Sequence, residues 1–69
     1  MIETYPLGAS VTIDGGKETG MIEEICLRGR AAEVYYLVEW HTGGDFIQRY
    51  VHESRVTSAR QKQKIGFKA

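Results

Sequence analysis

The most strand-like run of hydrophobic and aromatic residues lies in the middle of the chain, over residues 35–40. A strand turns successive side chains to opposite faces, so Tyr36, Val38 and Trp40 share one face and the residues between them share the other. β-Branched and aromatic residues also fit the pleated surface of a strand well. We therefore expect residues 35–40 to form the central strand of a small barrel.

Shorter alternating segments on either side predict further strands, separated by glycine-containing turns. The expected strands cover residues 9–13, 21–27, 45–50 and 56–58, and the expected turns cover residues 14–16 and 41–44. Residues 51–55 are too short and polar for a full helix, and they predict a 3-10 turn before the last strand. The pattern is that of an all-β domain with about five short antiparallel strands.

One predicted strand breaks the alternation. Ile22 and Ile25 are three positions apart, and both are apolar enough to require burial. A β-bulge at Glu23-Glu24 inserts one extra residue and would bring both isoleucines to the inner face. We therefore expect a bulge in the strand over residues 21–27.

The 69 residues correspond to a single domain. We divide it into a lead-in over residues 1–7, a barrel over residues 8–58 and a flexible basic tail over residues 59–69, which is either disordered or a short helix. A chain this short buries only about 60% of the surface that it exposes when unfolded, so its stability is marginal. Homo-oligomerisation is one way to add to it.

Charge is balanced overall but unevenly placed. Five basic residues against all nine acidic ones give the segment up to Arg55 a net charge of −4, and four basic residues after it carry +4. A basic tail on an acidic body could contact nucleic acid, a membrane surface or its own barrel. The alternative is a solvated tail that only aids solubility.

Candidate chemistry is sparse. A lone Cys26 excludes an internal disulfide, and together with the absence of an export signal it indicates a reduced, cytoplasmic setting. The longest apolar run, residues 34–38, is too short to cross a bilayer, so we expect a soluble protein. No nucleophile motif and no ligand spacing for a metal is present, so we expect no catalytic residues, no metal and no cofactor. The histidines and acids considered as ligands besides Cys26 are His41, His52 and Asp45.

The order of these elements resembles the SH3-like small barrels. The Val-x-Ile strand, glycine turn and Gly-x-Ile segment around residues 11–22 are similar to KOW and Tudor-type modules. The run Tyr36-Leu37-Val38-Glu39-Trp40 is similar to the Tyr-Leu-Val-Lys-Trp of chromodomains. The resemblance covers residues 8–58 and implies a small binding module, although such folds carry many unrelated functions.

A second, narrower resemblance is to type II dihydrofolate reductases, which are also short SH3-like barrels. Their Val-Gln-Ile-Tyr run is similar to Ile47-Gln48-Arg49-Tyr50. The resemblance implies a homo-oligomeric enzyme with its site at the subunit interface, where Gln48 and Tyr50 would act. The chain departs from that family at Arg49, where the family has isoleucine, and in the first strand, where the family's lysine falls on Ile13 or Thr12.

Aromatic and basic residues suggest two kinds of contact. Five rings could form a cage for a cationic side chain, although alternation buries about half of them: Tyr35, Tyr36, Trp40, Phe46 and Tyr50. Stacking rings beside cations could instead hold nucleic acid, against the repulsion of the acidic body. Our leading hypothesis is a non-enzymatic module that contacts a protein or nucleic-acid partner, not a membrane, through the 28–33 and 41–45 loops and the basic tail. The expected contact residues are Arg28, Arg30, Tyr35, Arg49, Tyr50, Arg60, Lys62 and Lys64.

Overall fold

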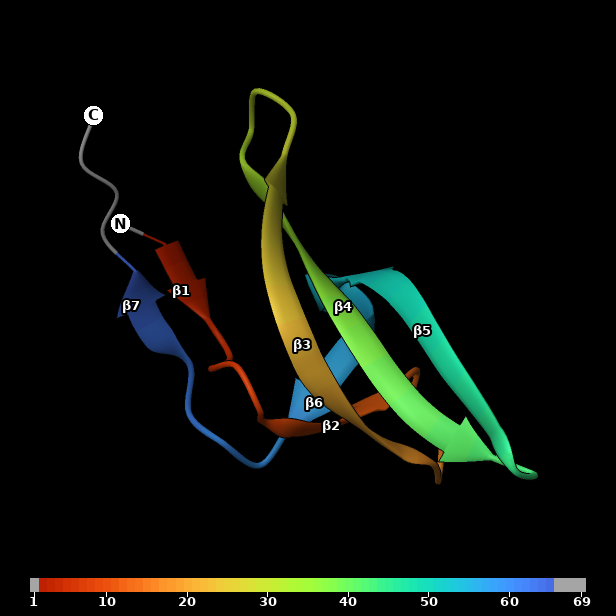
Figure 1. Cartoon of the computed structure of the whole chain (residues 1–69). Helices are drawn as coiled ribbons and strands as arrows, with labels where there is room; N and C mark the ends of the chain where they lie inside the picture. The colour runs from red at the N-terminus through yellow and green to blue at the C-terminus, as the bar shows by residue number, and fades with distance from the viewer. Residues whose placement is uncertain (1, 66–69) are drawn as a thin grey trace.

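The structure, a computed structural model, describes residues 2–65 and consists of seven antiparallel strands and one 3-10 turn (Figure 1). The elements are β1 (Ile2–Thr4), β2 (Ser10–Ile13), β3 (Thr19–Arg28), β4 (Glu33–Thr42), β5 (Asp45–His52), η1 (Glu53–Arg55), β6 (Val56–Ser58) and β7 (Gln63–Ile65). Five strands form the main sheet in the order β5-β4-β3-β2-β6, and β1 pairs with β7 in a separate two-stranded ribbon. The all-β, antiparallel prediction is confirmed.

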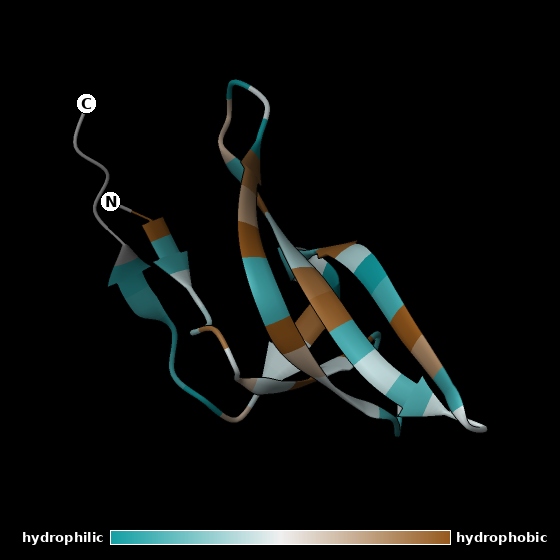
Figure 2. Ribbon diagram, viewed as in Figure 1, coloured by the Kyte–Doolittle hydropathy of each residue, from teal (hydrophilic) through white to brown (hydrophobic). Residues whose placement is uncertain are grey.

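The predicted central strand forms as β4, an interior strand of the main sheet next to the β5 edge, although β3 takes the middle place in the strand order. Residues 35–42 of β4 pair with β5, and residues 33–39 pair with β3. Tyr36 and Val38 are fully buried, and Trp40 packs against the same core while partly exposed. Figure 2 shows apolar bands between polar ones along β3, β4 and β5, without strict alternation. The pleat of the strands gives this part of the sheet an inner face on the core and an outer face.

The predicted β-bulge is present in β3. The pairing of β3 with β4 shifts register between Ile22 and Glu24, so that Glu23 is the extra residue. Ile22 is 1% exposed, and Ile25 packs against the core from its edge. The extra residue therefore restores both isoleucines to the inner face, for the reason expected from their spacing.

The predicted turns and the short elements after β5 are also confirmed. Gly43 and Gly44 have φ angles of +56° and +85° and form a two-residue hairpin loop between β4 and β5. Both residues of such a loop occupy the left-handed region, where glycine carries no steric penalty. The 3-10 turn η1 then leads directly into β6, the expected last strand of the main sheet.

No closed barrel is detected among residues 2–65. Strands β5 and β6 are the two edges of the main sheet, and no pairing joins them. All three residues of β6 pair with β2. The connection from β5 to β6 consists only of the three-residue η1. An ion pair between Arg55 of η1 and Asp14, described below, connects η1 to the turn after β2.

The two ends of the chain differ from expectation, because residues 63–65 form a strand. β7 pairs with β1 in the register Ile2↔Ile65, which uses backbone groups that both short segments would otherwise leave unpaired. The tail was expected to be frayed or a short helix because a pairing between opposite ends of a chain leaves no local pattern. Its last residues, including Lys68, lie outside the described residues. Within residues 2–65 there is no helix of the length and apolar character needed to cross a membrane.

Candidate aromatic and basic contact sites

Three of the predicted contact residues meet on the outer face of β3, β4 and β5. The guanidinium carbon of Arg28 lies 4.9 Å from the ring centre of Tyr35 and 5.1 Å from that of Tyr50. One residue comes from each of the three neighbouring strands. A guanidinium within about 6 Å of a ring centre is attracted to the electron-rich ring face, so Arg28 is shared between two tyrosines. We call Arg28, Tyr35, Tyr50 and the adjacent His52 the arginine–tyrosine cluster.

His52 fixes one end of the cluster. Its ring meets that of Tyr35 edge-on, with ring centres 5.1 Å apart and planes at 80°. Nδ1 accepts a hydrogen bond from the backbone N–H of Ser54, which places the proton of the neutral ring on Nε2. Nε2 lies 3.8 Å from a carboxylate oxygen of Glu33. The cluster therefore combines one guanidinium, two phenol rings and one imidazole with one acid beside it.

Large exposed apolar side chains extend along the same outer face from the cluster towards the β4–β5 hairpin. Tyr50 is 45% exposed, Phe46 is 52% exposed and Met21 is 41% exposed. Leu37 lies opposite Tyr50 in the register of β4 and β5 and is almost fully buried. Exposed aromatic, methionine and arginine side chains on one flat face are the composition typical of protein contact surfaces.

The opposite end of the outer face is acidic. Glu23, the extra residue of the bulge, shares a hydrogen bond with Glu39, and this hydrogen bond, with the partial desolvation and the charges of Glu39 and Glu24, raises the pKa of Glu23. Arg28 and Glu33 lie at the other end of the same strands. The outer face is therefore positive at the 29–32 turn and negative at the bulge.

The remaining predicted contact residues are dispersed. Arg30 is exposed in the turn between β3 and β4, and Arg60 and Lys64 are exposed in the segment leading into β7 and in β7 itself. Lys62 contacts its own domain, with Nζ 3.9 Å from a carboxylate oxygen of Glu53 and 5.1 Å from the ring centre of Tyr5. Of the roles weighed for the basic tail, contact with its own domain is the one seen at Lys62.

Arg49 lies on the inner face, away from the cluster. Its guanidinium carbon is 6.0 Å from the ring centre of Trp40. The five rings considered as a cage are likewise divided, with Tyr36 and Trp40 on the inner face and the other three on the outer face. They therefore do not form one cage.

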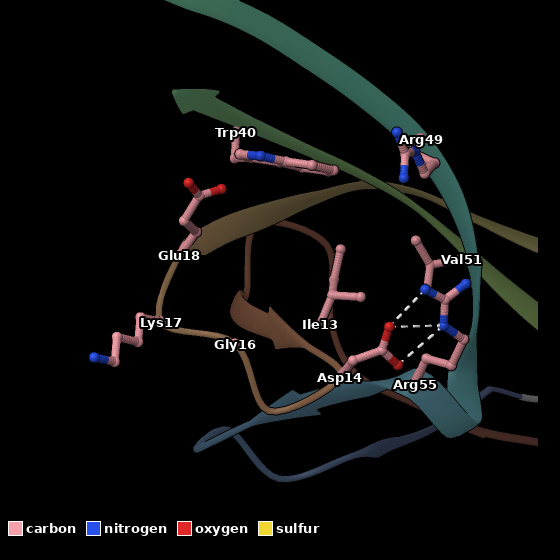
Figure 3. Close-up of a pocket in the computed structure, with 9 residues that line it drawn as sticks. All are labelled: Ile13, Asp14, Gly16, Lys17, Glu18, Trp40, Arg49, Val51 and Arg55. Carbon is pink, nitrogen blue, oxygen red and sulfur yellow. Dashed lines mark hydrogen bonds and ion pairs between the residues drawn. The ribbon is translucent and has the colours of Figure 1, made fainter. Parts of the chain in front are cut away.

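Arg49 and Trp40 border a cavity of about 300 Å³ between β4 and β5 on one side and the end of β2 with its following turn on the other. Figure 3 shows the flat indole of Trp40 on one side and Ile13 on the opposite side, with Arg49 and Arg55 at one end. The other lining residues are Asp14, Gly16, Lys17, Glu18 and Val51. We call this cavity the Trp40 pocket. It was not predicted, because its walls come from the β2–β3 turn, β4, β5 and η1, and no local sequence signal joins them.

An ion pair closes one end of the Trp40 pocket. Arg55 donates from Nε to both carboxylate oxygens of Asp14, at 3.0 and 3.1 Å, and from Nη2 to Oδ2 at 2.6 Å. The hydrogen bonds from Arg55 hold the pKa of Asp14 below its ordinary value. A bidentate arginine–carboxylate pair has a fixed geometry, so it positions η1 against the turn after β2.

We searched the described residues for side chains that could bind a metal ion. Residues 2–65 hold no group of three or more His, Cys, Asp or Glu side chains arranged to bind a metal ion. Cys26 is a free, partly buried thiol on β3.

Comparison of the chain with known protein families, with curated proteins and with solved structures found no match.

Proposed function

We propose that this chain is a protein-binding module that contacts its partner through the outer face around the arginine–tyrosine cluster. The observation that carries the proposal is Arg28 held between the rings of Tyr35 and Tyr50 while Tyr50 is 45% exposed. Tyrosine and arginine dominate the energetic centres of protein interfaces, because they combine a large contact area with directed polar groups. The ring stacking pre-orients Arg28, which lowers the entropy lost when a partner binds it.

Charge favours a protein partner over a nucleic acid. The outer face carries Arg28 at one end, but Glu23, Glu24 and Glu39 at the other, and no lysine stands on its strands. Nucleic-acid affinity depends largely on cations that neutralise phosphates, and this acidic group would repel the backbone. A protein surface with both signs of charge can match such a face.

We also infer that the main sheet is an SH3-like barrel left open at one seam. The order of strands, the bulge in β3 and the 3-10 turn before β6 support this inference. The seam is the gap between β5 and β6, the two unpaired edges of the sheet. The partner face on the outside of β3, β4 and β5 is independent of whether the seam is closed.

Affinity capture from cells that express the chain natively tests the proposed function. The wild-type protein should retain one or more defined proteins, and Tyr50→Ala should lose them because it removes one of the two rings that hold Arg28. Thr57→Ala is the control, since it changes an exposed residue of β6 outside the outer face of β3, β4 and β5 and should retain the same proteins. Nuclease treatment distinguishes the partners: loss of the captured material on nuclease treatment, or equal capture by Tyr50→Ala, would contradict the proposal.

The oligomeric enzyme hypothesis makes a different prediction for the same face. Gln48 and Tyr50 are both exposed on β5, so an active site built from them requires further copies of the chain to cover them. The binding proposal predicts no turnover of dihydrofolate with a nicotinamide cofactor at any oligomeric state. Native mass spectrometry combined with that assay decides between the two, and turnover that depends on Gln48 would overturn the binding proposal.

A further inference from the structure

We propose that the Trp40 pocket binds a carboxylate carried on an aromatic or flat apolar group. This inference concerns a second site, on the other side of the sheet from the arginine–tyrosine cluster, and is independent of the protein partner proposed above. It rests on three features of the pocket: the engagement of its acids, the freedom of its remaining cations and the apolar surfaces of its walls.

The two acids of the pocket differ in how they are engaged. Asp14 receives three hydrogen bonds from Arg55, which compensates its charge. Glu18 accepts a hydrogen bond of 3.0 Å from the neutral hydroxyl of Thr42 and keeps its charge. Glu18 lies at the end of the pocket opposite Arg49 (Figure 3), so the Arg49 end holds no uncompensated acid among the lining residues.

The two remaining cations have no such partner. Among the described residues, Arg49 and Lys17 make no ion pair and no side-chain hydrogen bond. Arg49, Arg55 and Asp14 lie at one end of the pocket, so that end carries a net positive charge, whereas the Lys17 side chain extends away from the pocket (Figure 3). A guanidinium presents a planar fork of donors that matches a carboxylate. The local charge thus selects an anion.

The walls select a flat apolar body. The indole of Trp40 faces Ile13 across the pocket, and Val51 lies beside Arg49 on β5 (Figure 3). A volume of about 300 Å³ is at the lower end of the range for small-molecule sites and suits one ring-bearing group. A methylated ammonium ligand is disfavoured, because Arg49 already occupies the cation position at 6.0 Å from the Trp40 ring.

Two sources could supply this chemistry: a free aromatic acid, or the C-terminal residue of a protein chain ending in an aromatic side chain. Both present one carboxylate next to one ring. The experiment therefore compares phenylacetate with a short peptide that ends in phenylalanine, and each is matched by its amide, which has the same shape but no charge.

Trp40 is the only tryptophan of the chain, so its fluorescence reports occupation of the pocket directly. We expect the acids to change the emission of Trp40 with a Kd on the order of 1 mM, as the size of these probes implies. The amides should bind about 10-fold more weakly or worse, because they lose the charged pair with Arg49. Tighter binding of the peptide than of phenylacetate would identify a protein C-terminus as the natural source.

Arg49→Gln should weaken acid binding about 10-fold, whereas Arg28→Gln, the matched loss of a guanidinium on the outer face, should leave it unchanged. Arg49→Met, which removes the charge but keeps a long side chain, is the second pocket variant should Arg49→Gln fail to fold. Equal binding of acid and amide, unchanged binding by both pocket variants, or no change in the Trp40 emission with either acid would overturn the proposal.

Discussion

The phenolic oxygen of Tyr36 accepts a hydrogen bond of 2.9 Å from the backbone N–H of Tyr5, which ties the segment after β1 to the middle of β4. The Tyr36 side chain is fully buried, and this burial raises its pKa. The two rings also pack together, with centres 5.9 Å apart. One side chain of the central strand thus holds the β1–β7 ribbon against the main sheet.

Tyr36→Phe should therefore destabilise the protein by about 1–2 kcal/mol, because it removes the acceptor and leaves the N–H of Tyr5 without its partner. The free energy of unfolding in urea measures the loss. Tyr35→Phe is the matched control: the same atom is removed from a residue on the outer face, and we expect a change within about 0.5 kcal/mol. Equal effects of the two substitutions would contradict this role of Tyr36.

Thr4, at the end of β1, is 1% exposed, and its hydroxyl has no hydrogen-bond partner among the described residues. A buried hydroxyl without a partner costs free energy, and valine has nearly the same shape without it. We expect Thr4→Val to stabilise the protein by about 1 kcal/mol, read from the urea midpoint. Thr57→Val, at an exposed position of β6, should change little, and a clear loss of stability in Thr4→Val would reveal a partner for the hydroxyl.

Gly20 marks a close approach between β3 and β4. A Cβ atom at this position would lie 2.6 Å from Cγ1 of Val38 and 2.9 Å from the backbone oxygen of Glu39. Because Val38 is fully buried, the core must shift to make room. Gly20→Ala should cost about 1–3 kcal/mol, as overpacked core substitutions do. Thr19→Ala, next to it and exposed, should be nearly neutral; stability unchanged in Gly20→Ala would show that the strands are further apart.

Glu23 gives a pH-dependent prediction. Its pKa is raised above the ordinary value of 4.5 by the hydrogen bond with Glu39, by desolvation and by the neighbouring acids. A carboxyl with a raised pKa in the folded state favours folding when protonated, and this contribution is lost as the pH rises through that pKa. Glu23→Gln should therefore raise the melting temperature at neutral pH and lose this advantage near pH 4, where the carboxyl is protonated. A shift of the same size at both pH values would argue against the acidic group as its cause.

Much of the main sheet could be predicted from the sequence because its signals are local. The β-branched and aromatic run over residues 35–40 predicted the interior strand β4, and the three-residue spacing of Ile22 and Ile25 predicted the bulge. The glycine pair in the hairpin and the polar run before β6 predicted the turns. Each of these features is decided by residues within one or two strands.

The features that could not be predicted depend on pairings between distant segments. Strand β7 forms only because β1 lies beside it, and the Trp40 pocket joins residues of four separate elements. The stacking of Arg28 on Tyr35 and Tyr50 follows from the register of three strands, including the shift at the bulge. Arg49 was grouped with Tyr50 as a contact residue, although neighbours in one strand face opposite sides and the sequence alone could have separated them.

Arg28 and Arg49 provide the most direct test of the central claim, which is that the partner binds the outer face of the sheet. They are two arginines on opposite faces of the same sheet, each beside an aromatic ring. The measurement is the Kd of the captured partner for Arg28→Ala and for Arg49→Ala. We predict a loss of about 10-fold or more for Arg28→Ala, as for the centre of an interface, and little change for Arg49→Ala. A loss confined to Arg49→Ala, or equal losses in both, would contradict the account.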